Sequence, residues 1–216
     1  MAFSDWNMTL FRIINDLGKQ YTSLNSVFVF LAEYMVYFLC FGCILYWFTR
    51  NNKNRMMVIQ ASIAFVMAEI VGKIVGMFYS NYQPFAELSN VNQLIEKSVN
   101  NSFPSDHTIL FFSICFSFWL VRKKEGAFWL LLAFGVAISR IWVGVHYPAD
   151  VMVGALLGII SALTVYRVAP KVSFIKKSLA IYEKGEQYFL PAKIRSEDVE
   201  QELILQNFKQ RSRENN

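Results

Sequence analysis

Long apolar runs constrain the fold of this sequence more than any other feature. Three of them approach or exceed the roughly 20 residues that a helix needs to cross the hydrocarbon core of a bilayer, namely residues 27–48, 56–79 and 151–168. Two shorter runs, 108–121 and 127–143, flank the polar segment 122–125 and predict antiparallel helices joined by a tight turn. A soluble bundle would need polar helix faces, which these runs lack. We therefore predict an all-α membrane bundle with five transmembrane helices.

Composition excludes several other classes of protein. Of the 216 residues, 55% are hydrophobic and 17% are charged, which excludes a disordered chain and a nucleic-acid-binding tail protein. The length suits one domain of ordinary size. Cys40, Cys43 and Cys115 all fall within apolar runs, so we expect buried small apolar side chains rather than a disulfide framework or a metal cluster.

The distribution of lysine and arginine predicts the orientation of the bundle, because cytoplasmic loops carry the excess of these residues. They concentrate after the first span, in the segment 122–125 and beyond residue 167. We therefore place the amino terminus outside the membrane and the carboxyl terminus in the cytoplasm, with loops 80–103 and 144–147 facing outward. No cleavable signal peptide is expected, because residues 1–20 lack a basic patch followed by an unbroken apolar core.

The chain divides into three parts on this interpretation. Residues 1–22 mix apolar and charged side chains at helical spacing and predict an amphipathic helix at the membrane interface, for which packing is the preferred role. Residues 23–170 form the transmembrane domain. Residues 171–216 form a basic cytoplasmic tail, which begins with a helical apolar pattern suited to the anionic inner leaflet and is expected to be mobile beyond Pro191.

The two histidines stand where apolar runs begin, each beside a proline and an aspartate. The first group comprises Pro104, Ser105, Asp106 and His107, and the second comprises His146, Pro148 and Asp150. Proline favours the first turn of a helix, and the unpaired N–H groups there bind anions. If the third span begins at Pro104, it regains the length that a membrane crossing needs, and its first turn carries Ser105 and His107 at the outer surface.

Further polar residues converge on this outer face in the predicted topology. Arg140 lies in the last turn of the fourth span, Lys73 lies about two turns from the outer end of the second, and Gln83 follows that end. Each position alone has a purely structural explanation: Arg140 can extend to the interface, and the histidines can cap helices. Their convergence on one face favours a functional site.

The residue types at this face suit metal-free phosphoryl transfer. One histidine can attack phosphorus while an aspartate holds its other ring nitrogen, and the second histidine can protonate the leaving oxygen. Cationic side chains and helix starts can stabilise the phosphoryl oxygens. No acidic cluster is available to hold a metal ion, so we predict no metal and no cofactor.

Two motifs carry a family resemblance. Residues 102–108 read Ser-Phe-Pro-Ser-Asp-His-Thr, and residues 139–150 contain Ser-Arg, five residues, His, three residues and Asp. They resemble the second and third signature motifs of the type 2 phosphatidic acid phosphatase superfamily, which shares its architecture with vanadium haloperoxidases. The resemblance extends over nearly the whole chain to bacitracin-resistance undecaprenyl-diphosphatases, including residues 31–38 and 139–142.

The resemblance implies a membrane enzyme that hydrolyses undecaprenyl diphosphate to the monophosphate and phosphate through a phosphohistidine. Such an enzyme recycles the carrier lipid of cell-wall synthesis and confers bacitracin resistance. The implied roles are nucleophile for His146, orienting partner for Asp150 and general acid for His107. The implied substrate-binding residues are Ser105, Asp106, Ser139 and Arg140. Asp106 stands where many relatives have glycine, and this difference points to the polyprenyl-diphosphatase branch.

The first signature motif departs from the family pattern. Gln83-Pro84 stands where Arg-Pro is expected, Gly76 takes the upstream lysine position, and Lys73 lies about one turn earlier. Lys73 and Gln83 are therefore candidate substrate ligands, although Lys73 is also spaced to pair with Glu69 at i,i+4.

Two acidic residues lie within the predicted spans. A charged side chain at mid-membrane costs ~2.5–3.5 kcal/mol on insertion scales. We expect Glu33 and Glu69 to line the polar floor of the site and position Lys73 or Gln83. The alternative is that both are protonated and hydrogen-bonded within the bundle.

A site at the interface allows a polyprenyl diphosphate to keep its tail in the bilayer while its head group enters from the outer leaflet. Four phenylalanines of the third span are better suited to packing or lipid contact than to a specific tail groove; they are Phe111, Phe112, Phe116 and Phe118. Two other functions stay open: a phosphatase for phosphatidylglycerophosphate or phosphatidic acid, and a non-catalytic membrane subunit of a bacitracin exporter. The oligomeric state is left open as well.

Overall fold

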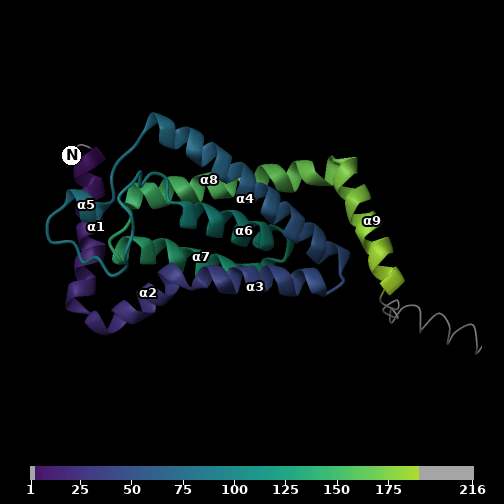
Figure 1. Ribbon diagram of the computed structural model, residues 1–216, viewed down its shortest axis with the longest axis horizontal. Coiled ribbons are helices and arrows are strands. Elements are labelled where there is room, and N and C mark those ends of the chain that lie inside the picture. The colour runs from purple at the N-terminus through teal and green to yellow at the C-terminus, as the bar shows by residue number, and fades with distance from the viewer. Residues whose placement is uncertain (1–2, 190–216) are drawn as a thin grey trace, which may run out of the picture. The chain divides into compact units, whose positions relative to one another are not determined.

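The computed structural model describes residues 3–189, which are helical apart from their connections and contain no strand (Figure 1). The helices in chain order are α1 (Phe3–Gln20), the 3-10 helix η1 (Thr22–Leu24), α2 (Asn25–Glu33), α3 (Met35–Phe48), α4 (Asn52–Phe78), α5 (Pro84–Glu87), α6 (Asp106–Val121), α7 (Lys123–Trp142), α8 (Pro148–Val168), the 3-10 helix η2 (Ala169–Lys171) and α9 (Ser173–Phe189). The predicted all-α class is confirmed for this part of the chain.

The chain separates into two compact units, residues 1–171 and 172–216. The first unit holds helices α1 to α8. In the second unit, α9 occupies the segment where the apolar spacing predicts a helix. The predicted mobile tail beyond Pro191 lies outside the described residues.

Several helices have the length and composition of membrane spans. Among the described residues, α4, α7 and α8 with its η2 extension each meet both requirements. The pair η1–α2 and α3 meets them together, but it bends by 46° at Tyr34. Helix α6 is apolar but has only 16 residues. The first unit therefore contains three candidate spans, or four with the bent pair, whereas the sequence predicts five.

The predicted start of the third span at Pro104 is wrong. Helix α6 begins at Asp106, and Ser105 precedes it in an extended conformation (φ −74°, ψ 111°). The backbone N–H of Ser105 donates to the carbonyl of Asp150 over 3.2 Å, so the chain here is tied to α8 and does not yet follow the helix. His107 lies in the first turn of α6, whereas Ser105 occupies the N-cap position.

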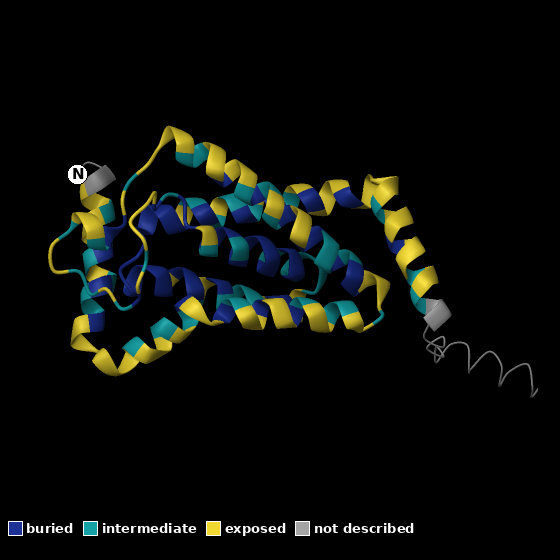
Figure 2. Ribbon diagram, viewed as in Figure 1, coloured by how far each residue is buried: buried dark blue, intermediate teal, exposed yellow. Residues whose placement is uncertain are grey.

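Helix α6 lies at the centre of the first unit and packs against α4, α7 and α8 (Figure 2). Phe111, Phe112 and Phe118 are all buried, which makes them packing residues, while Phe116 is partly exposed. Helix α8 approaches α6 through a glycine: a Cβ added at Gly158 would lie 2.8 Å from the backbone nitrogen of Ser113. Small residues at helix interfaces allow this close backbone approach.

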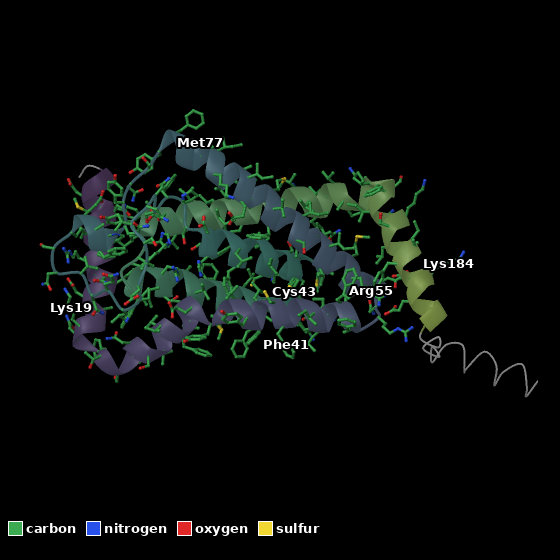
Figure 3. All side chains as sticks on the ribbon, in the orientation of Figure 1. Lys19, Phe41, Cys43, Arg55, Met77 and Lys184 are labelled. Atoms are coloured by element: carbon green, nitrogen blue, oxygen red, sulfur yellow. The ribbon has the colours of Figure 1, made fainter. Side chains whose placement is uncertain are left out.

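The outer faces of the surrounding helices are apolar. Phe41 of α3 is 58% exposed and Met77 of α4 is 82% exposed, and both lie on the outside of the bundle in Figure 3. Cys115 is buried in α6, whereas Cys40 is exposed on α3. The expectation of burial is therefore wrong for Cys40, because it lies on an outward-facing side of α3.

Helix α1 packs against α7 and α8 at the end of the bundle where α8 begins (Figure 1). The side chain of Asn15 is fully buried: its Nδ2 donates to the carbonyl of Trp142 over 2.8 Å, and its Oδ1 accepts from the backbone N–H of Asn92 over 2.9 Å. Asn7 accepts a hydrogen bond from the backbone N–H of Ala149 over 2.9 Å. These bonds support packing as the role of α1.

Candidate active site

A short buried turn between α7 and α8 positions His146. Every residue from 141 to 150 is buried, and His146 is itself 2% exposed. Gly144 reverses the chain with φ +85°, a conformation that favours glycine. The carbonyl of Arg140 accepts hydrogen bonds from the backbone N–H groups of Val145 and His146 over 3.2 and 3.3 Å. These bonds hold the turn against the last turn of α7.

Asp150, in the first turn of α8, faces Nδ1 of His146. Its Oδ2 lies 3.5 Å from that nitrogen and accepts a hydrogen bond from the backbone N–H of Tyr147 over 2.9 Å. Ser102 lies between the two side chains: its hydroxyl donates to Oδ2 of Asp150 over 2.5 Å and lies 3.1 Å from Nδ1 of His146. Ser102 thereby links the imidazole to the carboxylate.

Lys97 contacts the opposite nitrogen of the same ring. Its Nζ lies 3.0 Å from Nε2 of His146. An ammonium group has only donors, so Nε2 is the acceptor and the ring proton is on Nδ1. Burial, followed by the charges of Lys97 and Arg140, lowers the pKa of His146 well below its usual value. The imidazole is therefore neutral at physiological pH, with its lone pair on Nε2.

A cavity of about 430 Å³ lies next to these residues. Its polar lining includes Glu33, Glu96, Lys97, His107 and Arg140. These residues come from the end of α2, the connection before α6, the first turn of α6 and the last turn of α7. The cavity therefore brings together two cations and a histidine from separate elements, as phosphate binding requires.

Arg140 is held by the bent span. It is 2% exposed, and its Nη1 donates to the carbonyl of Ala32 over 2.9 Å. Ala32 lies in the last turn of α2, where carbonyls lack helical partners. The Nε of Arg140 is buried without a hydrogen-bond partner in the described part of the chain. An unpartnered buried donor beside a cavity is suited to an anionic ligand.

Ser105, Asp106 and Ser139 do not line the cavity. Ser105 is fully buried and its Oγ accepts a hydrogen bond from the hydroxyl of Thr108 over 3.1 Å, while Asp106 is exposed. Ser139 donates to the carbonyl of Val136 within α7 over 2.6 Å. Ser105 and Asp106 nevertheless immediately precede His107, at the start of α6.

The candidates from the first motif lie outside the cavity lining as well. Lys73 is exposed on α4, one turn from the half-buried Glu69, with which it interacts electrostatically. Gln83 is fully buried, and its amide is paired with Asn100: Nε2 donates to Oδ1 of Asn100, and Oε1 accepts from its backbone N–H over 3.1 Å. The structure thus gives Gln83 a partner in the connection before α6.

Two residues of this arrangement were not among the candidates from sequence. Ser102 is the first residue of the Ser-Phe-Pro-Ser-Asp-His-Thr motif, so its place in that motif was an available signal. Lys97 lies in an irregular connection without periodicity, and no sequence signal pointed to it. Among residues 3–189, no group of three or more His, Cys, Asp or Glu side chains is arranged to hold a metal ion.

Comparisons with known proteins show the family to which this chain belongs. The family model described as the PAP2 superfamily matches residues 58–174. A Bacillus licheniformis protein named bacitracin transport permease protein BcrC is 63% identical over 92% of this chain and 98% of its own. Undecaprenyl-diphosphatase BcrC of Bacillus subtilis is 30% identical over 82% of this chain and 92% of its own.

A solved structure supports the same assignment. The crystal structure of LpxE from Aquifex aeolicus superposes with a TM-score of 0.66 and 28% identity, covering 77% of this chain and 99% of LpxE. The family resemblance of the two signature motifs is therefore confirmed over both sequence and fold. With its apolar helices and the two motifs that carry its histidines, this chain is a multi-pass membrane protein that belongs to the PAP2 superfamily.

Proposed function

We propose that this protein hydrolyses undecaprenyl diphosphate to undecaprenyl phosphate and phosphate at the outer face of the bacterial plasma membrane. The observation that carries the proposal is the neutral, oriented imidazole of His146 beside a cavity that contains Arg140 and His107. The relative from Bacillus subtilis that is named an undecaprenyl-diphosphatase supports this choice of substrate. The reaction returns the carrier lipid for cell-wall synthesis and removes the diphosphate that bacitracin sequesters.

The first half of the reaction forms a phosphohistidine. Nε2 of His146 attacks the terminal phosphorus, an N–P bond forms, and the P–O bond to the lipid phosphate breaks. Asp150 and Ser102 hold Nδ1–H, so that the imidazolium that develops is stabilised. Arg140 stabilises the phosphoryl oxygens. His107 gives its proton to the leaving oxygen of undecaprenyl phosphate.

The second half regenerates the enzyme. His107, now neutral, takes a proton from a water molecule that attacks the phosphorus. The N–P bond breaks, the bonding pair returns to Nε2, and phosphate leaves. In the complex, the negative charge of the diphosphate offsets the charges of Arg140 and Lys97, which favours the protonated form of His107 at the start of the cycle.

The proposed topology has five spans: the bent α2–α3 pair, α4, α6, α7 and α8. Helix α6 is shorter than the other spans, and the helices around it, rather than lipid, cover most of its surface. The cavity lies at the outer end of the bundle, and basic residues including Lys53 and Lys123 lie at the inner end. A lipid head group then enters from the outer leaflet while its tail stays in the bilayer.

Phosphate release by the purified protein tests the proposal. We expect wild type to release phosphate from undecaprenyl diphosphate, and His146→Ala to lose this activity. Activity should survive EDTA, because the chemistry needs no metal; a loss that added Mg²⁺ restores would contradict the metal-free mechanism. Faster release from phosphatidylglycerophosphate or phosphatidic acid would assign a different lipid substrate.

The name of the Bacillus licheniformis relative favours a second candidate, a transport subunit without chemistry of its own. The two functions differ in their dependence on the nucleophile. As an enzyme, the protein loses bacitracin resistance with His146→Ala. As a transport subunit, it keeps that resistance. Minimum inhibitory concentrations of cells that express each form at equal levels separate the two.

A further inference from the structure

The first signature motif leaves a gap in the positive charge of the site. Its arginine position is Gln83, whose buried amide is paired with Asn100 and carries no charge. Lys73 is exposed on α4 and does not line the cavity. Among the residues that line the cavity, the lysine and arginine side chains are Lys97 and Arg140.

Lys97 is hydrogen-bonded to Nε2 of His146, the atom that must attack phosphorus in the proposed reaction. Its Nζ lies 3.0 Å from Nε2 of His146 and donates to the lone pair that must attack phosphorus. His146 is 2% exposed and does not line the cavity, whereas Lys97 does. Lys97 therefore stands between the nucleophile and the space that a phosphate would enter.

The backbone around Lys97 is anchored on both sides. The N–H of Leu94 donates to the carbonyl of Val143 over 3.2 Å, and the N–H of Ser102 donates to the carbonyl of Asn81 over 2.8 Å. The pairing of Gln83 with Asn100 fixes the same connection. A long flexible side chain on a fixed backbone can change partners without moving the loop.

We propose that Lys97 caps Nε2 of His146 until a lipid diphosphate enters and then moves to the phosphate, supplying the cation that the first motif lacks. The inference rests on the proposed phosphatase function. The exchange replaces an N–H···N hydrogen bond with a charge-assisted N–H···O⁻ bond, and no covalent bond changes. Only an anionic ligand offers this replacement, so the nucleophile is uncovered by the substrate itself.

The surroundings of Lys97 make its charge, and therefore the activity, depend on pH. Burial, followed by the charge of Arg140, lowers the pKa of Lys97 to about 8, while Asp106 and Asp150 oppose the shift. His146 is in direct contact, and His107, Glu33 and Glu96 share the cavity lining. In the free enzyme the Lys97 ammonium is therefore progressively deprotonated as the pH rises through about 8, whereas a bound phosphate favours its protonated form. We expect kcat/KM to fall above about pH 8 and kcat to fall less, since the two report free and bound enzyme respectively.

The test compares Lys97→Met with Lys97→Arg, and uses Lys53→Met, at the exposed start of α4, as a control. A charge-assisted hydrogen bond to phosphate predicts that Lys97→Met lowers kcat/KM for undecaprenyl diphosphate by about 10- to 100-fold. We expect Lys97→Arg to retain most of the activity and to shift the alkaline fall to higher pH. A variant Lys97→Met with wild-type kcat/KM overturns the proposal, and so does a large loss in Lys73→Met with none in Lys97→Met.

A second readout does not depend on activity. The chain has two histidines, so ¹⁵N-histidine NMR of the full-length protein in detergent can follow His146, with His107→Gln for assignment. Because the charge of Lys97 lowers the pKa of His146, Lys97→Met should raise it and Lys97→Arg should not. An unchanged pKa of His146 in Lys97→Met overturns the proposal that Lys97 caps Nε2. If the wild type hydrolyses no lipid diphosphate, the proposed function fails, while this titration still decides the Lys97 contact.

Discussion

At the scale of single residues, Ser102 links the two members of the His146–Asp150 pair. Its hydroxyl bonds to the carboxylate over 2.5 Å, whereas the direct distance from Nδ1 to Oδ2 is 3.5 Å. Ser102→Ala should therefore lower kcat about tenfold with little change in KM, because one bond to a charged group is lost. Ser102→Thr should restore part of kcat. Ser113→Ala, at another buried serine, serves as the control, and an equal loss there would assign the effect to general destabilisation.

His107 gives a prediction that depends on the leaving group. A general acid contributes ~10²–10⁴-fold to rate, and its contribution grows with the basicity of the leaving oxygen. His107→Gln should therefore lose more activity toward phenyl phosphate than toward p-nitrophenyl phosphate, whose leaving group is the weaker base. Steady-state rates with the two substrates measure the difference. Equal losses with both would show that His107 does not protonate the leaving group.

Residue types and spacing were sufficient to predict that four residues of the proposed active site lie close together. His146, Asp150, His107 and Arg140 stand at helix boundaries, where sequence patterns are informative, and the structure gathers them around one cavity and its adjoining turn. Lys97 could not be predicted, because its position depends on hydrogen bonds between distant loops and not on a local pattern.

At the scale of secondary-structure elements, α1 braces the turn that carries His146. The Nδ2 of Asn15 donates to the carbonyls of Trp142 and Asn92, and its Oδ1 accepts from the backbone N–H of Asn92. Asn15→Leu would leave these buried groups unpaired, which costs about 1–3 kcal/mol of folding free energy. We expect a lower melting temperature and a lower kcat. Thr9→Ala, at an exposed position of α1, should change neither; wild-type stability in Asn15→Leu would contradict the bracing role.

The positions of the apolar helices could be predicted from the sequence, because each long apolar run has few structural alternatives in a membrane. The break at Tyr34 could not, because no proline or glycine marks it and the contact there joins Arg140 to Ala32, 108 residues away. The start of α6 was misplaced for a similar reason, since the N–H of Ser105 bonds to Asp150 of α8.

At the scale of the whole molecule, orientation is testable with single cysteines in a cysteine-free background. Ser98 is exposed beside the site, and Lys124 is exposed in the first turn of α7, near the opposite end of the bundle. In intact cells, a membrane-impermeant maleimide should label Ser98→Cys, and it should label Lys124→Cys only after permeabilisation. The reverse pattern would place the site in the cytoplasm and exclude access from the outer leaflet.

The central claim is that His146 carries the phosphoryl group, and rapid quenching with undecaprenyl diphosphate labelled at its terminal phosphorus tests it most directly. We predict acid-labile, alkali-stable label on the peptide that contains His146, and none in His146→Ala. Turnover by wild type without protein-bound label, or label that persists in His146→Ala, would contradict the account.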